Sequence, residues 1–192
     1  MYCYTDYPSA ELFVNGKSQG RITKNRDSRL DRYRLRWNNV KYEPGELKVV
    51  VYDADGNAAG EQIIKTAGKP AKLQLDAWTQ QSDLSPLTSS LSPLVADGND
   101  MAFITVSLTD AEGTLIPNAS DQLTFEVTGA GAFEAVCNGD ATSLESFKQP
   151  TMKLFNGQLV VIVRAAKSPG TLTLKVTSPQ RQLSETINID VK

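Results

Sequence analysis

Residues 10–20 read Ala-Glu-Leu-Phe-Val-Asn-Gly-Lys-Ser-Gln-Gly, and this stretch decides the fold of the first part of the chain. Alternating apolar residues stop at Asn15-Gly16. An Asn-Gly pair between two strand-like runs is the strongest short-range signal for a β-hairpin, because both residues tolerate the positive φ of the turn. We therefore expect a β-sandwich to begin here, with a strand on each side of the turn.

A second alternating stretch follows at residues 32–37, which read Arg-Tyr-Arg-Leu-Arg-Trp. A period of two predicts a strand whose three arginines share one face, while Tyr33, Leu35 and Trp37 enter the core. The basic face has two interpretations. It is either a solvated surface or a contact for an acidic partner, such as a neighbouring domain of the same protein.

Residues 53–57 read Asp-Ala-Asp-Gly-Asn, which resembles the opening of a calcium-binding loop. An EF-hand needs flanking helices and a closing glutamate, whereas strand-like residues lie directly on both sides of this segment, at 46–52 and up to Thr66. We therefore predict a hairpin turn, with Gly56 supplying the positive φ, and no metal site.

The segment Gly68-Lys69-Pro70 interrupts the strand pattern, and alternation starts again at residues 72–76. We predict an all-β protein of two immunoglobulin-like antiparallel β-sandwich domains in tandem, residues 1–69 and residues 70–192. Residues 79–93 are rich in Ser, Gln, Leu and Pro, which predicts a long surface excursion. Further strands of the second domain are predicted at residues 101–109, 122–128, 132–137, 157–164, 171–177 and 184–191.

Composition indicates a globular protein, since 40% of the residues are hydrophobic and 22% are charged. The net charge of −2 divides into +3 for residues 1–69 and −5 for residues 70–192. Neither half concentrates enough positive charge for phosphate recognition, so we expect no nucleic-acid partner. No apolar run is long enough to span a bilayer, so we expect no membrane partner.

Because the chain starts in strand-like sequence and shows no secretory signal, we expect a piece of a longer polypeptide whose first domain lacks its opening strand.

The chain contains no histidine. This excludes Ser-His-Asp and Cys-His nucleophilic sites and every histidine-based zinc site. Cys3 and Cys137 are too few and too far apart for a metal cluster, and in predicted strands we expect them to be small buried hydrophobes. We expect no metal and no cofactor. Four carboxylates of the second domain are interpreted as surface charges and turn formers, namely Glu126, Glu134, Asp140 and Glu145.

Several segments of the first domain carry a resemblance: residues 10–20, Trp37, residues 44–48, Asp55-Gly56 and Thr66-Ala67-Gly68. Together they resemble a small domain near the C-terminus of β-galactosidase-like enzymes of glycoside hydrolase family 2. Further segments resemble the final domain of the same enzymes, and these are residues 96–100, 106–110, Gly113, 117–119, 125–131, 138–140 and 155–157. The order of the two domains also matches, so the likeness covers nearly the whole chain.

Family 2 enzymes are retaining glycosidases, in which an acid/base and a nucleophile lie on an (α/β)₈ barrel. This chain shows no alternation of strand and helix patterns, so the resemblance assigns it no catalytic residue. It implies a non-catalytic C-terminal accessory fragment that serves domain packing, active-site access or subunit contact. Its partners would then be the other domains of a parent enzyme that hydrolyses β-galactosides or related glycosides. The same analogy implies a periplasmic or secreted location.

Two other functions stay open. Carbohydrate-binding modules stack aromatic rings on sugar faces and add polar hydrogen-bond partners, which makes Trp78, Asn138 and Asp140 candidate contacts for an oligosaccharide. Segments such as Ala96-Asp97-Gly98 are also common in the immunoglobulin-like repeats of bacterial adhesins. The second alternative is therefore an adhesin-type stalk module.

Overall fold

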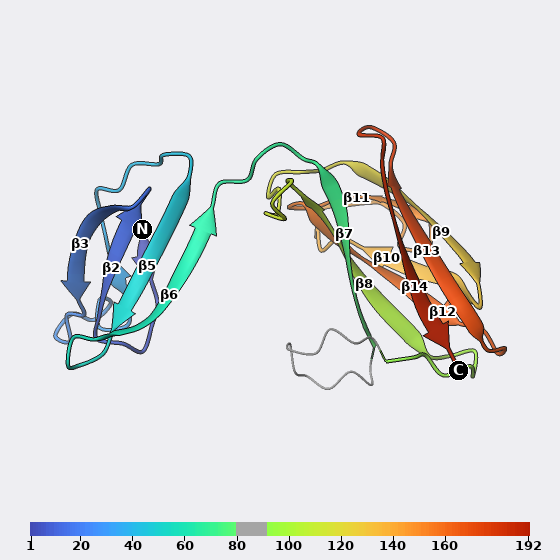
Figure 1. The fold of residues 1–192 in the computed structure, drawn as a ribbon, viewed down its shortest axis with the longest axis horizontal. Helices are drawn as coiled ribbons and strands as arrows, with labels where there is room; N and C mark the ends of the chain where they lie inside the picture. Colours follow the sequence, from blue (N-terminus) through green and yellow to red (C-terminus); the bar gives the residue numbers. More distant parts are fainter. Residues whose placement is uncertain (80–91) are drawn as a thin grey trace. The chain divides into compact units, whose positions relative to one another are not determined.

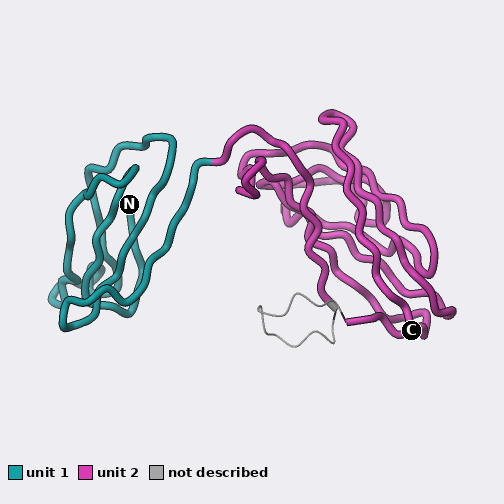
Figure 2. The backbone as a smooth tube through the Cα atoms, in the orientation of Figure 1, with its two compact units in different colours: residues 1–66 teal, residues 67–192 magenta. Residues whose placement is uncertain are grey.

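The computed structural model describes residues 1–79 and 92–192, and these residues form strands, turns and loops (Figure 1). The named strands pair antiparallel throughout, which confirms the predicted fold class. The described residues include no helix long and apolar enough to cross a membrane. The chain divides into two compact units, Met1–Thr66 and Ala67–Lys192 (Figure 2). Residues 80–91, which make up most of the predicted excursion at 79–93, lie outside the described residues.

Unit 1 is built on a sheet with the strand order β3-β2-β5-β6, accompanied by a ribbon of β1 and β4. At the predicted hairpin, φ is 48° for Asn15 and 77° for Gly16, the left-handed values that a two-residue type I′ turn requires. The hairpin is therefore confirmed. The strands of unit 1 are β1 Tyr2–Cys3, β2 Ser9–Val14, β3 Lys17–Thr23, β4 Leu35–Arg36, β5 Glu46–Tyr52 and β6 Ala58–Lys65.

A small apolar core holds unit 1 together. Ala10 and Leu12 of β2 are fully buried against Leu35 and Trp37, which come from β4 and the residues after it. The indole N–H of Trp37 donates to the carbonyl oxygen of Gly20 at 2.9 Å, so its polar edge is satisfied inside the core. The ribbon thus supplies the second layer that one face of the sheet needs.

The strand predicted at residues 32–37 is wrong in its first half. Only Leu35–Arg36 forms a strand, and the Tyr33 side chain is 63% exposed, whereas Leu35 and Trp37 enter the core as expected. The reason is a turn: Tyr33 N–H donates to the carbonyl oxygen of Leu30 at 3.2 Å. Asp31 then binds the guanidinium groups of Arg34 at 3.1 Å and Arg36 at 3.2 Å. Local polar contacts at the turn therefore override the alternation.

The segment 53–57 is a hairpin turn, as predicted. The Asp53 carboxylate accepts the backbone N–H of Asn57 at 2.8 Å and its side-chain N–H at 3.3 Å. The bond from the Asn57 backbone is the main reason that the pKa of Asp53 lies below its usual value. Gly56 has φ 90°, as the turn requires.

Unit 2 is a sandwich of two sheets, with the strand orders β10-β12-β8-β7 and β11-β9-β13-β14 (Figure 1). Their inner faces share one apolar core, to which β8 contributes Ala102, Ile104, Val106 and Leu108, all fully buried. All the strands predicted after residue 100 are confirmed within one or two residues, and β11 was missed. The strands are β7 Lys72–Thr79, β8 Met101–Thr109, β9 Gln122–Gly129, β10 Gly131–Cys137, β11 Thr151–Lys153, β12 Gln158–Ala165, β13 Gly170–Ser178 and β14 Leu183–Val191.

A buried carboxylate fixes the start of unit 2. Asp110 is 3% exposed and accepts backbone N–H groups from Gly68 at 2.8 Å, Thr114 at 2.7 Å and Glu112 at 3.1 Å. The Gly68 bond is the main reason that the pKa of Asp110 lies below its ordinary value. Asp110 therefore ties the residues before β7 to the loop after β8.

We expect Leu12→Ala to destabilise unit 1 alone. Removing this fully buried side chain costs about 2–5 kcal/mol, a large share of the stability of a domain of this size. Calorimetry should show the unit 1 transition at a lower temperature and the unit 2 transition unchanged. The control Ile64→Ala, at a side chain that is 61% exposed, should leave both transitions in place. A single transition that shifts as a whole would contradict two separate cores.

We expect Asp110→Asn to lower the melting temperature of unit 2 at pH 7, because an amide cannot accept all the N–H groups that the carboxylate accepts. A depressed pKa contributes stability above the pKa of the unfolded chain, about 3.9, and this contribution is lost as pH falls through the folded value. The difference between the two proteins should thus shrink below about pH 4. Melting curves at several pH values test this, with the exposed Asp190→Asn as the control. A difference that grows on acidification would refute the assignment.

Candidate functional site

Trp78 lies on β7, at the edge of the β10-β12-β8-β7 sheet, and its side chain is 49% exposed. It points away from the core because its neighbour Ala77 packs toward the core. The indole ring stacks on the ring of Phe103 in β8, with centroids 4.4 Å apart and 13° between the planes. The register pairs Trp78 with Phe103, Phe103 with Ile162, and Ile162 with Ala135. An apolar row therefore crosses the outer face of the sheet.

Polar side chains continue this outer face along β7. Asp76 and Gln74 are exposed, at alternate positions before Trp78, and Gln74 Nε2 donates to Asp76 Oδ2 at 3.0 Å. We refer to Trp78, Phe103, Asp76 and Gln74 as the Trp78 face. Such a surface can stack on an apolar ring and hydrogen-bond to the hydroxyl groups around it. With Asp76 as its one carboxylate, it lacks the acid pair of a retaining glycosidase.

The structure brings Asn138 and Asp140 together in the loop after β10. Asn138 Nδ2 donates to the carbonyl oxygen of Lys153 at 3.0 Å, and Asn138 Oδ1 accepts the backbone N–H of Asp140 at 3.0 Å. Asp140 Oδ1 accepts the hydroxyl of Thr142 at 2.7 Å and its backbone N–H at 2.8 Å, and the hydroxyl bond is the main reason for the lowered pKa of Asp140. Both side chains therefore hold the loop closed.

Trp78 is not part of that loop. β7 and β10 are opposite edges of one sheet, so three strand spacings, about 14 Å, separate the strand of Trp78 from β10, the strand that leads into the loop of Asn138. The three residues singled out from sequence thus do not form one site. Sequence reasoning missed Asp76 and Gln74, although the alternation of residues 72–76 already puts them on one face with Trp78. It could not find Phe103, because that contact depends on the register between β7 and β8.

Glu134 of β10 and Glu145 of the loop after it are both held by partners within unit 2. Glu134 binds Lys148 Nζ at 2.7 Å and Arg164 Nε at 3.0 Å, and these two cations, Lys148 first, hold the pKa of Glu134 below its usual range. Glu145 accepts N–H groups from Gln122 and Lys153, each at 3.3 Å. The described ranges contain no cluster of three metal-ligating side chains. These carboxylates hold loops and strands in place.

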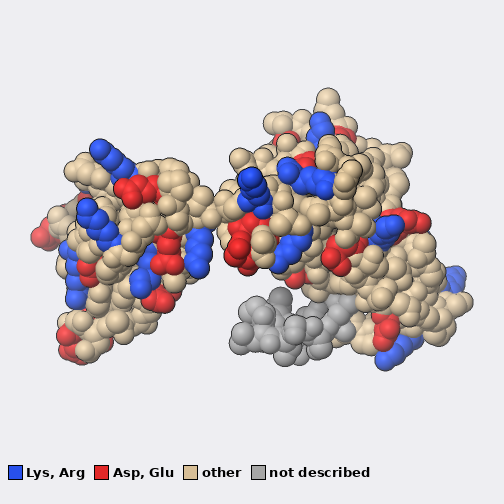
Figure 3. Space-filling model, turned by 45° about the horizontal axis from the view of Figure 1, so that its top comes forward, with Lys and Arg blue, Asp and Glu red and all other residues tan. Residues whose placement is uncertain are grey.

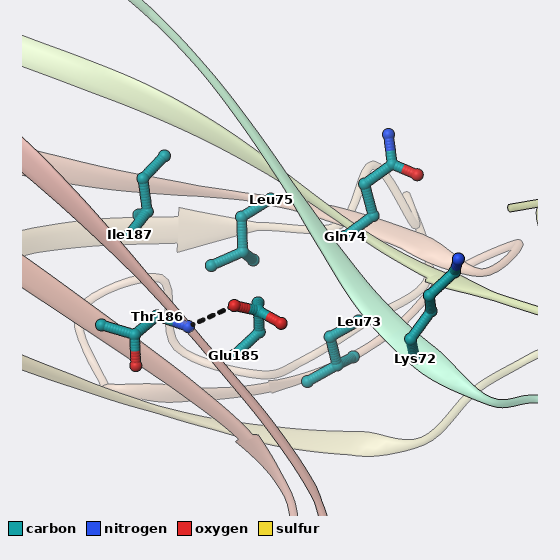
Figure 4. A pocket seen from close by; sticks show the side chains of 7 residues that line it. All are labelled: Lys72, Leu73, Gln74, Leu75, Glu185, Thr186 and Ile187. Carbon is teal, nitrogen blue, oxygen red and sulfur yellow. Dashed lines mark hydrogen bonds between the residues drawn. The ribbon is translucent and has the colours of Figure 1, made fainter.

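A shallow groove of about 320 Å³ lies between the edge strands β7 and β14 (Figure 4). Leu73, Leu75 and Ile187 form its apolar lining, and Lys72, Gln74, Glu185 and Thr186 complete it. Glu185 accepts the backbone N–H of Thr186 at 3.1 Å, so its carboxylate covers an outward-facing group of the edge strand. The sequence could not indicate this groove, because it joins strands more than a hundred residues apart.

Positive and negative side chains are mixed on both units, on the face drawn in Figure 3. On unit 1, the three arginines of residues 32–36, which we refer to as the arginine stripe, are partly neutralised, since Asp31 binds Arg34 and Arg36. The Arg34 guanidinium also lies 4.6 Å from the ring centre of Tyr2. The stripe is therefore a mixed arginine and tyrosine surface rather than a regular basic strand face.

Both cysteines are free thiols and are only half-buried, which corrects the expectation of fully buried side chains. Cys3 lies on the short ribbon strand β1, which shields it only in part, and this partial burial raises the pKa of its thiol. Cys137 is the last residue of β10, on the outer side of its sheet. The Cys3 thiol therefore lacks the lowered pKa that marks a reactive cysteine, because burial dominates there.

The comparisons with known proteins cover both units. Residues 86–187 match the family described as glycoside hydrolase family 2 C-terminal domain 5, and residues 1–60 match a domain of unknown function, DUF4982. A beta-galactosidase of Bacteroides ovatus is 39% identical over 93% of this chain and 19% of its own length. A beta-glucuronidase of Formosa agariphila is 26% identical over 93% of this chain and 16% of its own length.

Among solved structures, a glycosyl hydrolase family 2 member from Bacteroides cellulosilyticus matches all of this chain with a TM-score of 0.87 and 30% identity, over 22% of its own length. The chain thus spans about a fifth of the length of these relatives. The family match takes in more than half of the chain, which confirms the resemblance noted in the sequence. This chain belongs to glycoside hydrolase family 2, and it corresponds to the C-terminal domain region of those enzymes.

Proposed function

We propose that this chain is a non-catalytic accessory part of a larger family 2 glycosidase. The observation that carries the proposal is that several of its carboxylates are engaged by hydrogen bonds and ion pairs within the chain, and the direction of their pKa shifts agrees with it. A glycosidase general acid needs a raised pKa. Every described carboxyl with a clear shift instead has a lowered pKa, because N–H, hydroxyl or cationic partners stabilise its ionised form. These carboxyls are Asp53, Asp97, Asp110, Glu134 and Asp140.

The size and class of the fold support the same proposal. An (α/β)₈ barrel typically needs about 250 residues of alternating strand and helix. This chain has 192 residues, and its described part is all-β. The catalytic barrel of the parent enzyme would then lie in the four-fifths of the relatives' length that this chain does not span. Membership of a glycosidase family also favours this role over an adhesin-type stalk.

The accessory role that we propose is packing against other domains of the parent enzyme. Unit 1 exposes Tyr2 by 52% and Tyr33 by 63%, each beside an arginine: Arg34 lies 4.6 Å from the Tyr2 ring centre and Arg32 lies 5.0 Å from that of Tyr33. Tyrosine and arginine are enriched at the centres of protein interfaces. This surface is where we expect the contact.

For the parent enzyme, we propose hydrolysis of β-galactosides. The support is the higher identity to a beta-galactosidase, 39%, than to a beta-glucuronidase, 26%.

A periplasmic or secreted location is proposed by analogy with other sugar-degrading enzymes. Fractionating cells that produce the full-length protein tests the location.

We expect the purified chain to leave a chromogenic β-galactoside uncleaved, while the full-length enzyme cleaves it. The assay is release of the chromophore at high protein concentration. The matched control is the full-length enzyme with Glu134→Gln, which should keep its kcat because Glu134 is a structural ion-pair partner here. Turnover by the chain itself, abolished by changing one of its carboxylates, would refute the accessory role.

We also expect Arg32→Ala combined with Tyr33→Ala to speed thermal inactivation of the full-length enzyme while leaving its KM unchanged. The reason is that truncating two interface side chains weakens packing between domains without touching substrate. Half-lives at a fixed temperature give the readout, and the exposed Tyr42→Ala is the control. Equal half-lives for the double variant and the control would argue against this contact surface.

A further inference from the structure

The side chains of the Trp78 face lie outside the core of unit 2, so core packing does not explain why an aromatic residue stands there. The core takes the alternate residues of the same strands, among them Ala77 of β7 and Ile104 of β8. Trp78 itself is 49% exposed, although burying an indole ring would stabilise the fold strongly. It also continues the apolar row through Phe103 and Ile162 across the outer face of the sheet. An apolar surface of this kind, with polar groups at its border, is typical of a binding contact.

The stacking geometry prepares one ring face of Trp78 for a ligand. Phe103 covers one face of the indole at a centroid distance of 4.4 Å and holds its plane nearly parallel to its own. β7 is the edge of its sheet, so among the described residues no further strand pairs beside the opposite ring face. The ring is therefore fixed in orientation before a ligand arrives, which lowers the entropic cost of binding.

The polar part of the face determines which ligand fits. Asp76 lies two residues before Trp78 on the same side of β7, about 6.7 Å along the strand, and Gln74 lies the same step further. The hydrogen bond between Gln74 Nε2 and Asp76 Oδ2 orders both side chains. A hexose ring presents an apolar C–H face and a border of hydroxyl groups, which matches an aromatic platform beside a carboxylate and an amide. The Asp76 carboxylate would repel an acidic sugar.

We propose that the Trp78 face binds a neutral hexose unit of a glycan. The C–H face of the sugar stacks on Trp78, and its hydroxyl groups hydrogen-bond to the Asp76 carboxylate and the Gln74 amide. This binding requires neither catalysis nor any other domain, so it stands or falls separately from the accessory role proposed above.

Fluorescence of the unaltered chain tests the proposal. Of the two tryptophans, Trp37 is 5% exposed and Trp78 is 49% exposed, so acrylamide should quench mainly Trp78. Lactose, a neutral β-galactoside, should protect this emission from quenching in a saturable way, and glucuronate should not. If neither lactose nor longer galacto-oligosaccharides protect the emission at concentrations up to about 50 mM, the proposal is overturned. Binding weaker than this would be too weak for the stacking and hydrogen bonds proposed.

Calorimetric titration of variants locates the site. Trp78→Ala should abolish lactose binding, Trp78→Phe should keep it with reduced affinity, and Asp76→Ala should weaken it about tenfold through loss of a hydrogen bond to a charged group. The control Phe155→Ala removes another exposed aromatic ring of unit 2 and should change nothing. Melting curves confirm that each variant folds. Full binding by Trp78→Ala would overturn the proposal. A second outcome would also overturn it: the unaltered chain binds no sugar, and Trp78→Ala no longer binds the remainder of the enzyme. That outcome would identify the Trp78 face as a protein contact.

Discussion

A β-strand can direct only every second side chain into a core, and this constraint organises unit 2. Along β8, Ala102, Ile104, Val106 and Leu108 are fully buried, while Phe103 between them stays half-buried on the outer face. The two sheets pack against each other through the inward-facing side chains, and the residues between these therefore lie on the outer face. Because Ala77 packs toward the core, Trp78 must face outward. The candidate binding surface is thus a consequence of the same alternation that closes the sandwich.

Three carboxylates of this chain bind the backbone of its own turns and loops. Asp53 closes a hairpin, Asp110 binds three N–H groups at the start of unit 2, and Asp140 closes the loop after β10. Each such bond favours the ionised carboxylate and lowers its pKa. An acidic group used in this way stabilises turns between strands, and it is poorly suited to donate a proton to a leaving group. The abundance of acids in unit 2 is therefore compatible with a role outside catalysis.

The features predictable from sequence were those set by local chemistry. The Asn15-Gly16 turn, the turn at residues 53–57 and the longer strands of unit 2 follow from turn residues and period-two alternation. The prediction was wrong for Tyr33, because a turn and the ion pairs of Asp31 replace the first half of the expected strand. It missed β11, which is only three residues long. The stacking of Trp78 on Phe103 and the groove between β7 and β14 depend on pairing between distant strands, which no local pattern specifies. For the same reason, the sequence could name Trp78 and Asn138 as candidate sugar contacts but could not show that they lie on the sides of two opposite edge strands, β7 and β10.

Thiol labelling along β8 tests the alternation of buried and outward-facing side chains most directly, in a chain whose Cys3 and Cys137 are replaced by serine. Single cysteines are placed at Phe103, Ile104, Thr105 and Val106, and the rate of reaction with a water-soluble maleimide is measured for each. We expect the labelling rates to alternate, with fast labelling at Phe103 and Thr105 and protection at the fully buried positions Ile104 and Val106. Labelling rates without this alternation, in variants that keep their β-sheet circular dichroism, would contradict this expectation.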